Sequence, residues 1–226
     1  MYILGSLIEN LLDNIDDINF VELDSLIIME SDELQNVSKL EKLLNITQKI
    51  YSNNLVGHHE KIEPLPLGLE RQAYRSSGRL KNFKKPPTLE IKSRPITFLI
   101  AWNNSTNKNR VKVKEIFGKD PRSLLINKRV NARTIHKLMR KTMFVPSPAG
   151  NGMDCHRTWE ALYLGCVPVV VKSEFCGDES WPILVVDDWT ELLSKSENEL
   201  NQIYNKFKLD RNKALQFSQM ILEKIQ

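Results

Sequence analysis

Short apolar runs rich in β-branched residues alternate with longer polar stretches along the second half of the chain. Runs of this kind are typical of strands in a parallel sheet that helices cover on both faces. Strand and helix patterns that alternate in this way predict a parallel α/β sheet with crossover helices. The expected strands cover residues 96–102, 124–126, 143–145, 166–171 and 183–186.

The first half of the chain shows a shorter version of the same pattern. Residues 20–29 predict a strand that ends in an acidic turn. Residues 34–51 place apolar side chains at near-helical spacing, which predicts a helix. Residues 61–70 predict a short strand that closes in a tight turn. We therefore expect a reduced N-terminal α/β domain before the five-stranded sheet.

Residues 76–95 separate the two halves. They contain serine, glycine, three prolines and many lysines with little apolar periodicity, which is typical of a linker. A domain boundary near Pro86 follows, with an N-terminal domain over residues 1–85 and a second domain over residues 86–226. The tail over residues 190–226 is expected to be helical and to pack on the sheet or across the cleft between the domains.

The segment from Phe144 to Val171 combines a strand, a glycine-containing loop, a helix and a second strand. Prolines and glycines between residues 146 and 152 interrupt regular structure. Asp154 is expected to cap the helix, and Arg157 and Glu160 lie one turn apart on one of its faces. A loop that opens onto a helix N-terminus brings backbone N–H groups and a positive dipole end together, which suits a phosphate.

Arg157 and Glu160 are the candidate ligand-binding residues of this helix. A guanidinium binds phosphate oxygens through two parallel hydrogen bonds, and a carboxylate can accept hydrogen bonds from ribose hydroxyls. The alternative is a surface ion pair at helical spacing, which is common and stabilises a helix only weakly.

The same segment resembles the donor-binding motif of exostosin-like glycosyltransferases. The strand, the glycine loop, the R-x-x-E-A-L helix at Arg157 and the G-C-x-P-V strand at Gly165 match that motif in order. The resemblance implies a GT-B fold, with a Rossmann-like C-terminal domain that binds a nucleotide sugar and, here, a reduced N-terminal α/β domain. It also implies sugar transfer with inversion and without a bound metal, and a UDP-sugar as the expected donor.

The resemblance further implies roles for individual residues. Arg157 would neutralise the donor diphosphate, Glu160 would bind the donor ribose, and Arg110 would approach the diphosphate from the opposite side. Residues 66–70 more loosely resemble the P-x-G-x-E passage that ends the N-terminal domain of related transferases. The other expected donor-binding residues belong to the glycine loop: Gly150, Asn151, Gly152, Asp154 and Cys155.

An inverting transferase needs a base that takes the proton from the acceptor hydroxyl. GT-B enzymes usually carry it in the N-terminal half, where Asp32 follows a strand and His58 and His59 lie in a loop. Each has an alternative explanation, because Asp32 can cap the next helix and the histidines can simply be solvated. The short N-terminal half also leaves open a need for self-association or for a partner subunit.

Charge is distributed unevenly along the chain, although the formal net charge is only +4. Residues 1–63 hold 4 Lys or Arg against 12 Asp or Glu, a balance of −8. Residues 108–141 hold 12 against 2, a balance of +10. The basic part indicates an anionic ligand. A nucleotide diphosphate fits better than nucleic acid, because no interleaved aromatics or nucleic-acid-binding motifs accompany the basic residues.

Composition describes an ordinary folded chain, with 41% hydrophobic and 27% charged residues among 226. No signal sequence, transmembrane segment or metal-ligating Asp-x-Asp is visible; residues 30–32 come nearest to the last of these. The three cysteines, Cys155, Cys166 and Cys176, suit neither a zinc site nor a disulfide framework, so a reducing compartment and a cytoplasmic location are expected.

The sequence therefore favours an exostosin-like, metal-independent inverting glycosyltransferase that transfers a sugar from a nucleotide diphosphate sugar to a glycan or another hydroxyl acceptor. No cofactor is expected, since the nucleotide sugar is a substrate. One alternative is a non-catalytic nucleotide-sugar-binding protein or a subunit that needs a partner for activity. Another is a basic nucleic-acid-binding module, whose affinity would fall steeply with salt.

Overall fold

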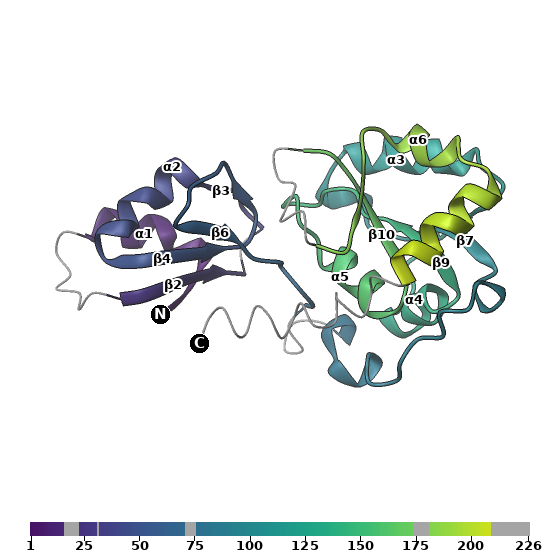
Figure 1. Ribbon diagram of the computed structural model, residues 1–226, viewed down its shortest axis with the longest axis horizontal. Helices are drawn as coiled ribbons and strands as arrows, with labels where there is room; N and C mark the ends of the chain where they lie inside the picture. The colour runs from purple at the N-terminus through teal and green to yellow at the C-terminus, as the bar shows by residue number, and fades with distance from the viewer. Residues whose placement is uncertain (16–22, 31, 71–75, 174–180, 209–226) are drawn as a thin grey trace.

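A computed structural model describes residues 1–15, 23–30, 32–70, 76–173 and 181–208, and it shows a mixed α/β protein with two main parallel sheets. Figure 1 shows the two sheets in separate bodies, joined by the chain that leaves strand β6. The first body is the N-terminal domain and the second is the C-terminal domain. The coarse expectation of a parallel α/β protein is therefore confirmed.

The N-terminal domain contains a four-stranded parallel sheet in the order β1-β2-β4-β6. Its helices pack on one face of this sheet, where Ile8, Leu40 and Ile50 share one apolar core. The strands are β1 (Tyr2–Leu4), β2 (Leu23–Met29), β4 (Thr47–Ser52) and β6 (Ile62–Pro64). The helices are α1 (Ile8–Asp13) and α2 (Val37–Leu40), and β3 (Gln35–Asn36) pairs separately with β5 (Leu55–Val56).

The expected helix over residues 34–51 is wrong. Only α2 is α-helical in this range; a 3₁₀ turn follows at Glu41–Asn45, and β4 then enters the sheet between β2 and β6. Ile50 satisfies a helical spacing, but it pairs with Leu26 on one side and Ile62 on the other. These non-local strand pairings override the local pattern.

The C-terminal domain contains a five-stranded parallel sheet in the order β11-β10-β9-β7-β8, so the five expected strands are confirmed. The strands are β7 (Ile96–Ile100), β8 (Ser123–Leu125), β9 (Thr142–Pro146), β10 (Val167–Val171) and β11 (Leu184–Val186). The helices are α3 (Asn109–Gly118), α4 (Ala132–Met139), α5 (His156–Tyr163) and α6 (Trp189–Leu193), and residues 197–208 are also helical.

The strand order reverses between β7 and β9. After β7 the chain moves outward to β8, and it then returns to β9 on the other side of β7. In open α/β sheets ligands bind outside the carboxyl ends of the strands at such a switch point. The loops that follow β7 and β9 therefore lie where a ligand is expected.

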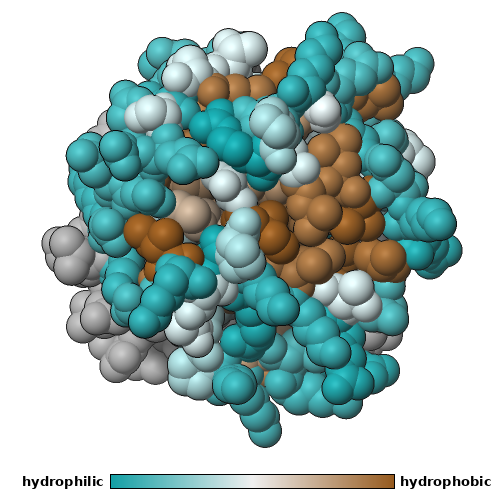
Figure 2. Space-filling model, turned by 90° about the vertical axis from the view of Figure 1, so that its right-hand side faces the viewer, coloured by the Kyte–Doolittle hydropathy of each residue, from teal (hydrophilic) through white to brown (hydrophobic). Residues whose placement is uncertain are grey.

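Two apolar cores enclose the C-terminal sheet. Phe98 and Phe144 belong to the larger core, together with side chains of α3, α6 and the helix at 197–208. Leu99 and Val145 point to the other core, which α4 and α5 cover. Alternating strand residues thus face opposite helical layers. On the surface turned away from the N-terminal domain, apolar side chains form one large patch and smaller ones among polar side chains (Figure 2).

Residues 76–95, the expected linker, pack against the C-terminal domain. Arg94 is only 2% exposed, and its guanidinium ties this segment to the sheet and its helices. Leu67 belongs to the larger core of the C-terminal domain, so the chain has already crossed between the domains before residue 76. The carbonyl oxygens that accept hydrogen bonds from Arg94 include those of Thr88, Met139 and Leu164.

Candidate functional site

The loop between β9 and α5 carries the glycines that the sequence singled out. Gly150 donates its backbone N–H to the carbonyl oxygen of Gly152 at 2.8 Å, which closes a tight turn. A Cβ atom on Gly152 would lie 2.7 Å from the carbonyl oxygen of Asp32 and from Nδ2 of Asn54. The loop therefore packs directly against the N-terminal domain, and Gly152 is required by that close approach.

Arg110, on the first turn of α3, holds this loop in place. Nε donates to the carbonyl oxygen of Ala149 at 2.9 Å, and Nη2 donates to that of Pro148 at 3.1 Å. Nη1 donates to the carbonyl oxygen of Asn103 at 3.0 Å and to the hydroxyl of Thr106 at 2.6 Å. Arg110 thus joins the loop after β7 to the loop after β9 at the switch point. These bonds make it a positioning residue, and direct contact with a diphosphate stays a prediction.

Asp154 does not cap helix α5, as the sequence had suggested; Cys155 occupies the N-cap position. The Asp154 carboxylate instead accepts hydrogen bonds from the backbone N–H of Leu67 at 2.7 Å and from Nε1 of Trp159 at 2.9 Å. Burial raises the pKa of Asp154 to about 6, although these two hydrogen bonds act in the opposite direction. The carboxylate that was expected to cap α5 therefore binds the segment that joins the two domains.

Asn54 completes this junction and was missed by the sequence. Its Oδ1 accepts the backbone N–H of Asp154 at 2.8 Å, and its backbone adopts a positive φ of 51°. Asparagine is one of the few residues that adopt this conformation readily. The signal in the sequence was the Asn53-Asn54 pair, but two consecutive asparagines are equally typical of an ordinary turn.

Arg157 and Glu160 face a polar cavity of about 540 Å³ on the other side of α5. Arg157 Nη1 lies 3.2 Å from Glu160 Oε2, and Glu160 is almost completely buried. The cavity size falls within the usual range for small-ligand sites. The predicted pair is therefore present, and it lines a cavity. The lining residues are Ser77, Arg129, Val130, Asn131, Ala132, Ile135, His136, Arg157 and Glu160.

The charge state of Glu160 follows from this setting. Burial alone would raise its pKa, but Arg157 and, more weakly, His136 outweigh that effect, so the pKa lies below its usual value. Glu160 is therefore an ionised carboxylate near neutral pH. An ionised carboxylate offers two acceptor oxygens and no proton, which suits the recognition of hydroxyl groups.

His136 is a second residue of this cavity that the sequence did not identify. Its Nε2 atom lies 3.6 Å from Glu160 Oε1, which is longer than a hydrogen bond. His136 is 4% exposed, and within the described residues neither of its ring nitrogens has a hydrogen-bond partner. Buried polar atoms without partners are rare and mark places where a bound ligand or water completes the bonding. The signal in the sequence was a titratable side chain beside the apolar Ile135 and Met139.

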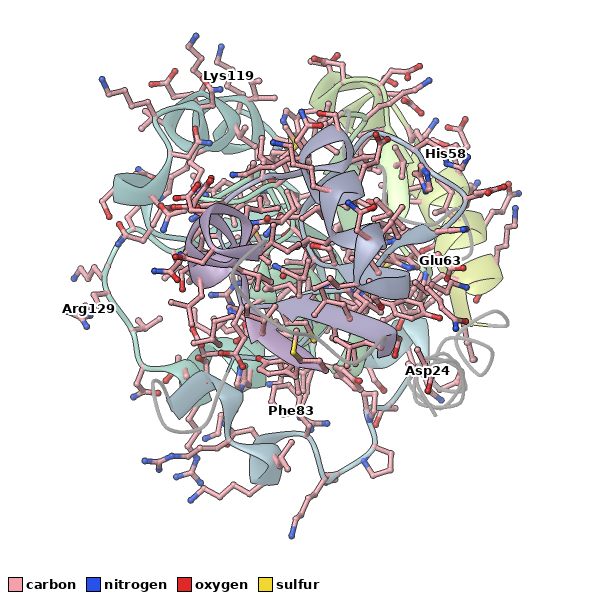
Figure 3. The ribbon with its side chains drawn as sticks, turned by 90° about the vertical axis from the view of Figure 1, so that its left-hand side faces the viewer. Asp24, His58, Glu63, Phe83, Lys119 and Arg129 are labelled. Atoms are coloured by element: carbon pink, nitrogen blue, oxygen red, sulfur yellow. The ribbon has the colours of Figure 1, made fainter. Side chains whose placement is uncertain are left out.

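The N-terminus of α4 contributes a positive end to the same cavity. Asn131 caps the helix by accepting the backbone N–H of Thr134 at 2.9 Å, and Ala132 lines the cavity behind it. Arg129 also lines the cavity and points outward from its rim (Figure 3). A helix N-terminus flanked by Arg129 and Arg157 is a favourable environment for an anion.

The structure places the three candidates for the catalytic base in different surroundings. Asp32 Oδ2 accepts a hydrogen bond from Nδ2 of Asn151 at 2.9 Å, which places this carboxylate beside the glycine loop. His58 is exposed and lies at the edge of the N-terminal domain (Figure 3). His59 is partly exposed, and its Nδ1 accepts the backbone N–H of Lys61 within its own turn. Asp32 is thus the candidate that the fold brings to the predicted donor loop.

A second, more apolar cavity of about 230 Å³ lies on the opposite side of α5. Ser147 and Thr158, which share a buried hydrogen bond of 2.8 Å between their hydroxyls, line it together with Trp159 and Trp181. Asp154 also borders this cavity, so the glycine loop lies at the edge of this space as well. Sequence patterns did not predict this cavity, because its walls come from four separate stretches of the chain.

Two of the three cysteines lie within the part of the chain that the structure describes. Cys155 and Cys166 carry free thiols, and burial raises the pKa of Cys166 to about 12. Cys176 lies outside the described residues.

Within the described part of the chain, no group of three or more His, Cys, Asp or Glu side chains is placed to hold a metal ion. No helix of that part has the length and apolar character to cross a bilayer.

Comparison with known protein families and with curated proteins finds no match for this chain.

Proposed function

We propose that the protein is an inverting, metal-independent glycosyltransferase that uses a nucleotide diphosphate sugar as donor. The observation that carries the proposal is the Arg157–Glu160 pair, whose ionised carboxylate and guanidinium face a cavity of about 540 Å³. The GT-B arrangement and the exostosin-like relationship belong to the same proposal. Their support is the R-x-x-E-A-L helix at Arg157, which follows a glycine loop in a parallel sheet.

In the proposed mechanism the donor nucleotide occupies the cavity. Glu160 accepts hydrogen bonds from the ribose hydroxyls, and Arg157 binds the diphosphate oxygens. Arg129 and the N-terminus of α4 add positive potential, which stabilises the charge that develops on the leaving nucleoside diphosphate. His136 offers a further hydrogen-bonding group from the buried side of the cavity.

The transfer itself is a direct displacement at the anomeric carbon. The acceptor oxygen forms a bond to that carbon while the bond to the diphosphate oxygen breaks, and Asp32 takes the hydroxyl proton. Its place beside Asn151, one residue from Gly152, is the support for Asp32 in this role. The products are an inverted glycoside and a nucleoside diphosphate.

The donor site is tested by calorimetric titration with uridine and guanosine diphosphates, each with and without EDTA. Arg157→Ala and Glu160→Ala are each expected to weaken binding by about tenfold or more, because each removes a charge-assisted contact. Lys112→Ala and Glu115→Ala are the matched controls, since they remove an exposed basic and an exposed acidic residue at the same spacing on α3. Absence of binding in the wild-type chain would contradict the proposal.

A second candidate is a non-catalytic nucleotide-sugar-binding protein, or a subunit whose partner supplies the base. The observation that favours it concerns Asp32, whose carboxylate is exposed and already accepts a hydrogen bond from Asn151. The two candidates differ in one measurement. Diphosphate binding without transfer or hydrolysis of any nucleotide sugar would favour the non-catalytic protein.

A further inference from the structure

Two segments of the C-terminal domain contain basic residues and no acidic ones. Residues 76–89 include four Lys or Arg, and residues 127–141 include six, while neither segment contains Asp or Glu. The next acidic residue along the chain, Glu90, is paired with Lys208 at 3.0 Å. Together, residues 76–89 and 127–141 form the basic surface.

Side-chain contacts bring the two segments together. The ring of Phe83 lies 5.0 Å from that of His136 on α4, measured between centroids. Arg140 Nη2 donates to the carbonyl oxygen of Asn82 at 3.0 Å. The first segment therefore runs along α4, and their positive charges share one region of the molecule.

Apart from the half-buried Arg140, the charged side chains of this region are exposed. Arg133 and Lys137 lie four residues apart on one face of α4, and Lys141 follows the end of that helix. All three are exposed, and so are the basic residues of the first segment: Arg79, Lys81, Lys84 and Lys85. The N-terminal domain has the opposite balance, so basic and acidic residues are concentrated in different parts of the molecule.

Two large apolar side chains are exposed within the same surface. Leu80 is 58% exposed between Arg79 and Lys81, and Val130 is 36% exposed next to Arg129. Basic residues that surround exposed apolar side chains suit the surface of an anionic membrane, where lysines bind headgroups and the apolar groups enter the interface. A soluble polyanion would use the charges, but it would gain nothing from exposed Leu80.

We propose that the basic surface binds the protein to an anionic membrane surface, of the phosphatidylserine-containing kind that faces the cytoplasm. Ser77 of the first segment and Val130 of the second line the cavity that contains Arg157 and Glu160. Docking would therefore bring the mouth of that cavity close to the lipid headgroups. The basic surface therefore adjoins the proposed donor cavity, but its binding to lipid does not rest on the proposed function and is tested without any assay of nucleotide binding or transfer.

The test measures co-sedimentation of the full chain with vesicles of phosphatidylcholine alone and of phosphatidylcholine mixed with phosphatidylserine. Binding is expected only with phosphatidylserine, and it is expected to weaken as salt is added. A chain with Lys81→Glu, Lys84→Glu and Lys85→Glu is expected to bind about a hundredfold more weakly, since each basic residue near the surface adds to the attraction.

The matched control chain carries Lys108→Glu, Lys112→Glu and Lys119→Glu, which change the net charge equally but affect exposed residues at α3. Figure 3 shows Lys119 and Phe83 at opposite ends of the molecule. The control is expected to change vesicle affinity by less than about threefold. Equal losses in the two chains would show that net charge alone is responsible and would overturn the proposal.

The apolar contribution has its own pair of variants. Leu80→Ser is expected to weaken vesicle binding by about tenfold, because an apolar side chain of this size no longer enters the interface. Val111→Ser, at a 41% exposed position on α3, is expected to leave binding unchanged. If the wild-type chain ignores phosphatidylserine vesicles but binds heparin or an oligonucleotide through Lys81, Lys84 and Lys85, the surface serves a soluble polyanion and the lipid proposal fails.

Discussion

The buried carboxylate of Asp154 accepts a hydrogen bond of 2.7 Å from the backbone N–H of Leu67, so the glycine loop is fastened to the segment along which the chain crosses between the domains. Asn54 holds the backbone of Asp154 from the N-terminal side. The predicted donor loop and the domain junction are thus parts of one structure. A change in the junction is expected to alter the loop.

The pKa of Asp154 predicts how stability depends on pH. Burial raises this pKa from 3.8 to about 6, so the folded state binds the proton more tightly than the unfolded state. The resulting stabilisation is complete below pH 3.8 and is lost as the pH rises through about 6. A shift of about two pKa units corresponds to about 3 kcal/mol in the free energy of unfolding.

Asp154→Asn provides the comparison for this prediction. The asparagine does not titrate, so the wild-type chain is expected to lose stability relative to the variant as the pH rises from about 4 to about 7. Urea unfolding of both chains across this range measures the difference. A difference that is independent of pH would contradict the prediction.

Gly152→Ala is expected to destabilise the protein by about 1 to 3 kcal/mol, because the added methyl group would overlap the Asp32 carbonyl oxygen and the Asn54 side chain. Gly118→Ala is the control. The methyl group there would meet only the end of the Leu125 side chain, at 3.2 Å, and is expected to have little effect. Chemical denaturation measures both variants, and equal effects would show that the domain contact does not restrict Gly152.

Arg110→Lys is expected to lower stability by about 2 to 4 kcal/mol, although the charge is retained, because an ammonium group cannot reach carbonyl oxygens on both loops at once. Arg133→Lys, which alters an exposed arginine on α4, is expected to have almost no effect. Thermal denaturation compares the two. A fully stable Arg110→Lys chain would show that the positive charge alone is sufficient.

Asp32→Asn separates binding from transfer in the proposed enzyme. The variant is expected to bind nucleoside diphosphate as the wild type does and to lose transfer by about a hundredfold or more, because the amide cannot accept the proton. His58→Gln is the control and is expected to retain transfer. Product formation from a nucleotide sugar is the measurement, and loss of activity in His58→Gln alone would assign the base to His58.

Local patterns predicted the C-terminal sheet well for a physical reason. Each of its strands is a short apolar run, and β9 and β10 are enclosed by two helical layers, so burial favours the same residues as strand propensity does. The same reasoning failed at Ile50, where helical spacing and strand pairing use the same apolar positions. Pairing with β2 and β6 places Ile50 in a strand.

The candidate site was predictable in its motif but not in its contacts. Arg157 and Glu160 lie one turn apart on a helix, so local geometry alone places them together. The roles of Arg110 and Asp154 depend on distant partners: Pro148 lies 38 residues from Arg110, and Leu67 lies 87 residues from Asp154. No spacing rule connects such distant groups, and both residues were expected to face the ligand or cap a helix.

The sequence by itself determined the alternation of strands and helices, the glycine loop and the Arg157–Glu160 helix, because each depends on neighbours within a few residues. Only the tertiary structure decided that Asp32 meets Asn151, that His136 shares the cavity of Glu160, and that residues 76–95 pack on the C-terminal domain. These contacts form between elements that become neighbours only when the apolar faces of helices and strands are buried together. The order of apolar and polar residues along the chain does not specify which distant elements will meet.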